Sequence, residues 1–225
     1  MEFDDFVLTA ATDDLAAEPA AREFADAVEF RMDLAADPLS ALADYDGDLP
    51  LIVTNRADWE GGEATDDAAR LDALATASEH PRVAAVDVEL RSLVGDAPGP
   101  DAGWVADHAR DHDTRVVASV HDFETTPPAL DDLLTRAAET GDVGKLAVTA
   151  ESRADTLALL SATHRATAAG HRVATMAMGD AGRHTRAVAP LYGSKIGYAP
   201  VDPADATAPG QYDLATLAGL VERLG

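Results

Sequence analysis

The sequence predicts an α/β protein that folds as a single-domain (β/α)₈ TIM barrel over residues 1–225. Short apolar, β-branched runs alternate eight times with alanine-rich helical patterns, and strict alternation favours a parallel sheet. No linker rich in Gly, Pro or Ser separates two halves, and no internal repeat is evident. The alternative is an open doubly wound sheet, but no G-x-G-x-x-G motif follows the first expected strand.

Each expected strand is a brief apolar run with polar flanks. These runs cover residues 6–9, 27–32, 51–55, 83–89, 116–121, 145–148, 173–178 and 191–198. The helical patterns cover residues 16–24, 39–44, 68–78, 102–112, 129–140, 154–169, 182–189 and 214–224. Pro127 and Pro128 precede one helical pattern and Gly170 follows another, which are ordinary start and stop signals.

The composition is strongly acidic, with 41 Asp and Glu against 17 Lys and Arg and a formal net charge of −24. Such a charge argues against nucleic acid as a partner, because phosphates would be repelled. The acids are spread along the chain in short groups, which indicates a surface adapted to high salt.

The sequence contains no apolar run of 18 residues, and it begins with an acidic segment. We therefore expect no membrane span and no signal peptide. Cysteine is absent, which removes disulfides and thiolate zinc sites and fits a reducing cytoplasm.

Polar side chains gather near the carboxyl ends of the expected strands. Because residues two apart in a strand share a face, five pairs are expected to project together: Glu29 and Arg31, Thr54 and Arg56, Asp87 and Glu89, Ser119 and His121, Met176 and Met178. In a barrel these ends form one rim, where the active site of such a fold lies.

Lys145 lies within an apolar strand pattern and is one of only two lysines in the chain. Burial disfavours the charged form of a lysine, so the position is tolerable if the neutral amine is the working species, as in Schiff-base chemistry. The alternative is a lysine at a strand edge whose amine reaches water.

Three further groups suggest chemistry at the rim. His121, at the end of a strand, is a candidate acid–base group or else a hydrogen-bonded core histidine. Arg56 and Arg186 are candidates for binding an anionic substrate, because a guanidinium matches a carboxylate bidentately. Glu29 and Arg31 could also form a structural ion pair. The other six histidines suggest no metal site.

With these residues in place, the chain resembles type I 3-dehydroquinate dehydratases along nearly its whole length. The resemblance rests on seven segments: Glu29-Phe-Arg31-Met-Asp; Pro50-Leu-Ile-Val-Thr-Asn-Arg56 with Glu60-Gly-Gly62; Val86-Asp-Val-Glu-Leu90; Ser119-Val-His121-Asp-Phe-Glu-Thr-Thr-Pro127; Lys145-Leu-Ala-Val148; Met176-Ala-Met-Gly179 with Arg186; and Ala208-Pro-Gly-Gln211.

The resemblance implies a cytoplasmic TIM-barrel homodimer that uses no cofactor or metal. It implies dehydration of 3-dehydroquinate to 3-dehydroshikimate, a step of the shikimate route to chorismate and aromatic amino acids. Lys145 would form the imine, His121 would move the proton, and Glu60 would orient His121. The implied substrate-binding residues are Glu29, Arg31, Arg56, Met178, Arg186, Tyr198, Thr207 and Gln211.

Thr207 departs from the serine usual in the family, although it keeps the hydroxyl, and the segment from Tyr198 to Gln211 is a candidate lid. Two other functions stay open on the residues alone. One is another Schiff-base barrel such as an aldolase, and the other is a non-catalytic ligand-binding barrel.

Overall fold

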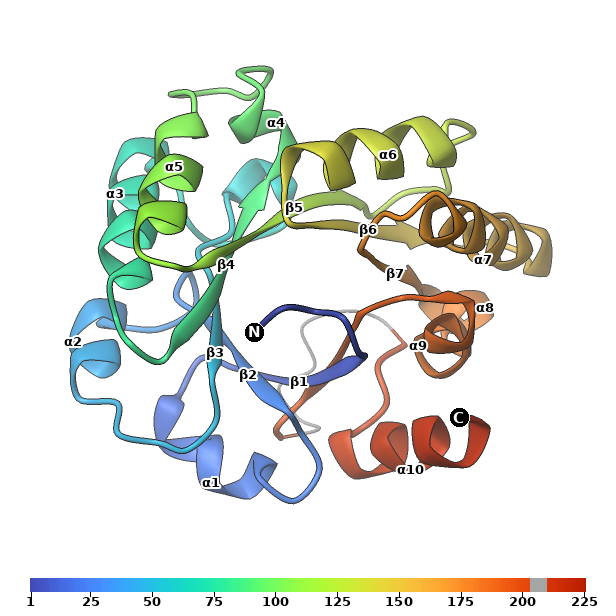
Figure 1. Cartoon of the computed structure of the whole chain (residues 1–225), viewed down its shortest axis with the longest axis horizontal. Coiled ribbons are helices and arrows are strands. Elements are labelled where there is room, and N and C mark those ends of the chain that lie inside the picture. The colour runs from blue at the N-terminus through green and yellow to red at the C-terminus, as the bar shows by residue number, and fades with distance from the viewer. Residues whose placement is uncertain (203–209) are drawn as a thin grey trace.

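Eight parallel strands curve into a ring in the computed structural model, which describes residues 1–202 and 210–225 (Figure 1). The predicted TIM barrel is confirmed. The strands are β1 (Val7–Thr12), β2 (Ala27–Arg31), β3 (Leu51–Thr54), β4 (Val83–Glu89), β5 (Arg115–Asp122), β6 (Val143–Thr149), β7 (Val173–Met178) and β8 (Ile196–Pro200).

The ring is continuous from β7 through β6 to β1 and on to β8. Between β7 and β8 the contact is looser. A single parallel bridge joins Val173 to Ser194, and the Lys195 amide donates to the Val173 carbonyl at 2.7 Å. The barrel is therefore nearly closed, and its strand ends form one rim.

Helices surround the ring on its outer side (Figure 1). They are α1 (Glu18–Ala21), α2 (Pro38–Ala43), α3 (Asp67–Ser78), α4 (Leu90–Leu93), α5 (Gly103–Asp111), α6 (Leu130–Thr140), α7 (Arg153–Ala168), α8 (Gly179–Gly182), α9 (Thr185–Val188) and α10 (Leu214–Leu224). Short 3₁₀ turns are η1 (Leu15–Ala17), η2 (Asp58–Glu60) and η3 (Ala189–Tyr192). Within residues 1–202 and 210–225, no helix has the length and apolar character needed to cross a bilayer.

The strand expected over residues 6–9 runs on to Thr12 as β1. Three other predicted elements were wrong in extent. The helix expected over residues 16–24 is a 3₁₀ turn followed by four helical residues, with Pro19 in the first turn of α1. The helix expected over 182–189 is divided between α8 and α9. The strand expected from Leu191 starts only at Ile196. Residues Ala189–Tyr192 form a 3₁₀ turn instead, with Pro190 near its start, and Gly193 ends it with a left-handed φ of 100°.

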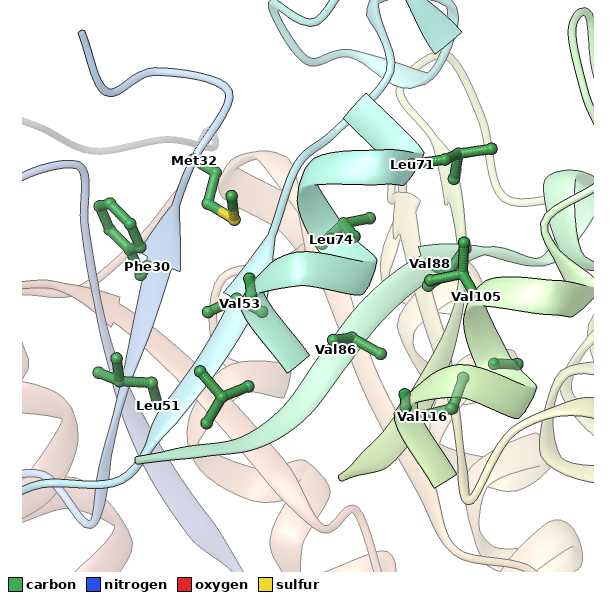
Figure 2. Close-up of a cluster of buried hydrophobic side chains, with 14 of the residues drawn as sticks. Phe30, Met32, Leu51, Val53, Leu71, Leu74, Val86, Val88, Val105 and Val116 are labelled. Atoms are coloured by element: carbon green, nitrogen blue, oxygen red, sulfur yellow. The ribbon is translucent and has the colours of Figure 1, made fainter. Parts of the chain in front are cut away.

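The main apolar core lies between the ring and its helices (Figure 2). The outward-facing side chains of β2 to β5 pack there against α3 and α5. The cluster includes Phe30, Met32, Leu51, Val53, Leu71, Leu74, Val86, Val88, Val105 and Val116, all at most 2% exposed. Every second side chain of a strand therefore faces outward, and the side chains between them point into the barrel.

Inside the ring, the amino-terminal half is apolar. Ile52, Val117 and Val143 belong to an interior cluster that includes Phe3, which precedes β1 and is 2% exposed. The N-terminal segment crosses the opening of the ring in Figure 1. It closes this end of the barrel.

Candidate active site

The carboxyl-terminal half of the barrel holds a cavity that opens to solvent. Among its lining residues are Lys145 and His121, which project from the adjacent strands β6 and β5. The register pairs Lys145 with Ser119, so His121 lies two residues nearer the rim on the same face. The amine and the imidazole predicted from the sequence therefore share one cavity.

Lys145 is 4% exposed, and its amine is held between charged and aromatic groups. Nζ donates a hydrogen bond to Asp87 Oδ2 at 2.8 Å and lies 3.8 Å from Glu29 Oε1. It also lies 4.2 Å from the centre of the Tyr198 ring. The lysine is thus fixed inside the ring, and the alternative of an amine at a strand edge reaching water is wrong.

Asp87 is the group on which the interior charges converge. Arg56 Nη2 donates to its other oxygen, Oδ1, at 2.6 Å. Burial by itself would raise the pKa of Asp87, but the charges of Arg56 and Lys145 outweigh it and hold that pKa well below its usual value. Asp87 is therefore an anion that ties the lysine to a fixed arginine.

Arg56 is bonded to protein acceptors on the neighbouring strands β4 and β5. Its Nη1 donates to Ser119 Oγ at 2.7 Å and to Glu89 Oε1 at 3.1 Å, in addition to the bond to Asp87. Glu89 in turn accepts from Arg70 Nη1 at 2.8 Å. Arg56 lines the cavity, yet both terminal nitrogens are already bonded to protein atoms, unlike a free anion-binding group.

Glu60 approaches His121 from the turn η2. Its Oε1 lies 2.9 Å from His121 Nδ1, and the Phe123 ring stacks on the imidazole with centroids 5.8 Å apart. The backbone after Glu60 needs two glycines. Gly61 has a left-handed φ of 81°, and a Cβ at Gly62 would lie 2.1 Å from the Arg56 carbonyl oxygen.

The Glu60–His121 pair is poised to exchange a proton near neutral pH. Burial raises the pKa of Glu60 to about 8, and the neighbouring Glu89 and Asp87 add to the rise against the opposing charge of Arg56. Burial, followed by the charge of Arg56, holds the pKa of His121 well below its usual value. When the pair is deprotonated, Nδ1–H donates to the Glu60 carboxylate and Nε2 is free to act as a base.

Arg186, on α9, presents the opposite case to Arg56. Its side chain lines the cavity and is only 4% exposed, and burial lowers its pKa to about 10, so it remains a cation at neutral pH. Within residues 1–202 and 210–225, Arg186 Nε and Tyr198 Oη are buried without a hydrogen-bond partner. Unpaired buried groups of this kind are costly unless a ligand satisfies them.

Arg31 and Glu29, which the sequence placed on one strand face, bind different partners. Arg31 pairs with Asp33, with Nη2 and Oδ2 2.6 Å apart, whereas Glu29 accepts from Thr54 Oγ1 at 2.9 Å. The structural ion pair between Glu29 and Arg31 that the sequence allowed is therefore replaced by these partners. Met178 and Gln211 line the same cavity.

Ten of the eleven predicted catalytic and substrate-binding residues line this one cavity. They are Glu29, Arg31, Arg56, Glu60, His121, Lys145, Met178, Arg186, Tyr198 and Gln211. Thr207, and most of the candidate lid from Tyr198 to Gln211, lie outside the described residues. The sequence reasoning assigned no site role to Asp87 and Glu89, although it placed them on one strand face at the rim. It did not single out Phe123 or Asp33.

Comparison with known proteins agrees with this geometry. A model of the type I 3-dehydroquinase family matches residues 6–224. The chain is 63% identical to the 3-dehydroquinate dehydratase of Haloarcula marismortui, with 100% of this chain and 98% of the relative covered. It is 58% identical to that of Halobacterium salinarum, with both chains covered in full.

A crystal structure of 3-dehydroquinate dehydratase from Geobacillus kaustophilus superposes with a TM-score of 0.82 at 26% identity. The alignment covers 98% of this chain and 91% of that chain. The chain therefore belongs to the type I 3-dehydroquinase family and is a hydro-lyase.

Proposed function

We propose that this chain dehydrates 3-dehydroquinate to 3-dehydroshikimate through a Schiff base on Lys145, as a step toward chorismate. The observation that carries the proposal is a buried primary amine that shares a cavity with the His121–Glu60 pair and with the Arg186 guanidinium, whose Nε has no hydrogen-bond partner among the described residues. A keto acid with hydroxyl groups offers one chemical partner to each of these groups.

The substrate carboxylate would bind Arg186, which has no carboxylate partner among the described residues. Such binding removes the cost of a buried unpaired guanidinium and fixes the ring of the substrate. Glu29, Arg31 and Gln211 line the same cavity and would contact the hydroxyl groups. Arg56 would act on the substrate indirectly, because it fixes Asp87 and thereby the position of Lys145 Nζ.

In the first stage, the Lys145 ammonium passes a proton to His121, and the uncharged amine attacks the C3 ketone. The carbinolamine hydroxyl takes that proton from His121 and leaves as water, which gives a protonated imine that draws electrons away from the neighbouring C2–H bond. His121 Nε2 takes the C2 proton, and the electron pair moves into the enamine. Glu60 stabilises the imidazolium that forms, through the bond to Nδ1.

In the second stage, the enamine pair expels the C1 hydroxyl, which leaves as water after His121 returns a proton to it. Attack by water on the imine carbon then restores the amine and releases the conjugated enone. The net change is the loss of one water from the substrate, and no electrons are gained or lost.

Borohydride trapping tests the covalent step. Borohydride with 3-dehydroquinate would reduce the imine to a stable amine and raise the mass of the chain. Lys145→Ala would show no adduct and nearly no turnover. His121→Ala would still give the adduct while turnover falls by about 10²–10⁴-fold, the usual contribution of a general base.

Two results would contradict the proposal. One is an adduct that persists at another residue in Lys145→Ala, and the other is ordinary turnover in His121→Ala. His164→Ala, an exposed histidine on α7, is the matched control and should match the unsubstituted protein in both assays.

We also infer from the family resemblance that the chain works in the cytoplasm as a homodimer. Light scattering during gel filtration at high salt would then give twice the chain mass of 23.4 kDa. A peak at the mass of one chain would refute the dimer.

A further inference from the structure

Two histidines and a glutamate meet at the end of the molecule opposite the cavity. Glu79 caps the carboxyl terminus of α3, and His108 and His112 stand one turn apart at the carboxyl terminus of α5. The two helices lie side by side (Figure 1). One ligand atom from each of the three side chains lies within 4.8 Å of the others.

The His112 imidazole is oriented by a hydrogen bond through one of its two ring nitrogens. His112 Nδ1 lies 2.9 Å from the His108 carbonyl oxygen. Because a carbonyl oxygen only accepts, Nδ1 carries the hydrogen, and the lone pair of neutral His112 is on Nε2. A histidine that donates its other N–H to a backbone carbonyl is the usual arrangement around a bound metal ion.

The third ligand is already in place. His108 Nε2 lies 3.1 Å from Glu79 Oε1, close to the separation of two ligand atoms on one tetrahedral ion. Glu79 and His112 are exposed and His108 is half-buried, so small rotations of these side chains can complete the site and water can supply a further ligand.

The surrounding charges favour a cation. The carboxyl termini of α3 and α5 both point at the cluster, and helix carboxyl termini carry partial negative charge. Asp107, Asp111 and Asp113 are exposed on or directly after α5. A divalent ion here would therefore enter a region of negative potential.

We propose that Glu79, His108 and His112 bind one divalent transition-metal ion of the Zn²⁺ class, outside the active site. Two imidazoles and one carboxylate suit this class better than Mg²⁺ or Ca²⁺, which prefer oxygen ligands alone. The ion would join the ends of α3 and α5 directly before β4 and β5 begin, and so fasten the closed end of the barrel. It takes no part in the dehydration.

The experiment uses the full chain, freed of metal with a chelator and then mixed with Zn²⁺ in potassium sulfate buffer, because chloride competes for zinc. After gel filtration we expect one retained Zn²⁺ per chain. A hundredfold excess of free Zn²⁺ over its dissociation constant should raise Tm by roughly 5–10 °C.

The variants separate this site from scattered surface binding. His112→Ala and Glu79→Gln should each weaken Zn²⁺ binding at least about tenfold and remove most of the Tm rise. His164→Ala, which removes an exposed histidine elsewhere, should bind as the unsubstituted chain does. All three variants should keep ordinary turnover, which shows that they are folded.

Three outcomes overturn the proposal. The first is that the unsubstituted chain retains no Zn²⁺. The second is equal Zn²⁺ affinity in His112→Ala and the unsubstituted chain. The third is that His164→Ala loses as much affinity as His112→Ala, which would mean adventitious binding to surface histidines.

Discussion

Lys145 occupies a position where a charged side chain is expensive, and its neighbours reduce that cost. Asp87 accepts its hydrogen bond, and Glu29 lies slightly farther away. Each carboxylate is held by a second partner, Arg56 for Asp87 and Thr54 for Glu29. The amine is therefore preorganised before any substrate arrives, which is the arrangement that favours a covalent step.

At the residue scale, Glu60 sets the pH dependence. Its pKa of about 8 exceeds that of a free carboxyl, so below that pH the Glu60–His121 pair holds an extra proton and Nε2 is not a free base. Activity limited by proton abstraction should rise with pH through that value. We expect kcat/KM of the unsubstituted chain to show this inflection in a pH titration of the enone absorbance.

Glu60→Gln removes the titrating carboxylate and leaves an amide of similar shape. The inflection near the Glu60 pKa should vanish, because the lowered pKa of His121 then controls the base. Turnover should fall by about 10²-fold or more, since the imidazolium loses its anion. Loss of turnover with an unchanged inflection would show that another group titrates.

At the scale of elements, the charged network joins strands that the backbone sheet already pairs. Arg56, beyond β3, bonds Asp87 and Glu89 of β4 and Ser119 of β5. The helix that follows β3 begins at an acidic cap: the Asp66 side chain accepts from the Ala69 amide of α3. Acidic residues thus serve both the interior and the helix termini.

Arg56→Met tests the network. The substitution removes the cation that pairs with the buried carboxylates of Asp87 and Glu89. This loss should reduce the free energy of unfolding by about 3–5 kcal/mol. Denaturant titration at high salt measures the change. Arg165→Met, which breaks the exposed ion pair with Asp131 at 2.8 Å, should cost less than about 1 kcal/mol. Equal costs would show that the interior network adds no stability.

Several elements could be predicted because local pattern and tertiary structure agree. β4 and β7 have the predicted bounds, since each is a β-branched or apolar run that starts directly after an arginine, Arg82 or Arg172. The strand predicted from Leu191 was wrong at its start, because an apolar residue between a proline and a glycine fits a 3₁₀ turn as well as a strand.

The residues that line the site could be predicted from the sequence, but the partners of their side chains could not. Strand periodicity places Glu29 and Arg31 on one face, but only the packed barrel shows that Arg31 turns to Asp33. The four-residue spacing of His108 and His112 is visible in the sequence. Their third partner, Glu79, comes from another helix and depends on how α3 packs against α5.

At the scale of the whole molecule, the net charge of −24 opposes compaction. Salt shortens the range of this repulsion, from about 10 Å at 0.1 M to about 3 Å at 1 M. Relatives at 63% and 58% identity come from Haloarcula marismortui and Halobacterium salinarum, which agrees with the adaptation expected from the composition.

Unfolding experiments over a range of KCl concentrations test this idea. The midpoint temperature should fall steeply as KCl is lowered toward dilute buffer, because the acids are then unscreened. Sucrose, which stabilises compact states without screening charge, should not replace the salt. A midpoint temperature that is the same in dilute and concentrated KCl would contradict the idea that salt stabilises the fold by screening its acidic residues.

Phe3 and the apolar layer beneath Lys145 close one end of the barrel, so among the described residues the cavity around the amine opens toward the carboxyl-terminal rim. The keto acid substrate, the released water and the enone product must all pass through this opening. A product molecule that lingers in the cavity therefore blocks the next substrate outright, and accumulated product should act as a competitive inhibitor.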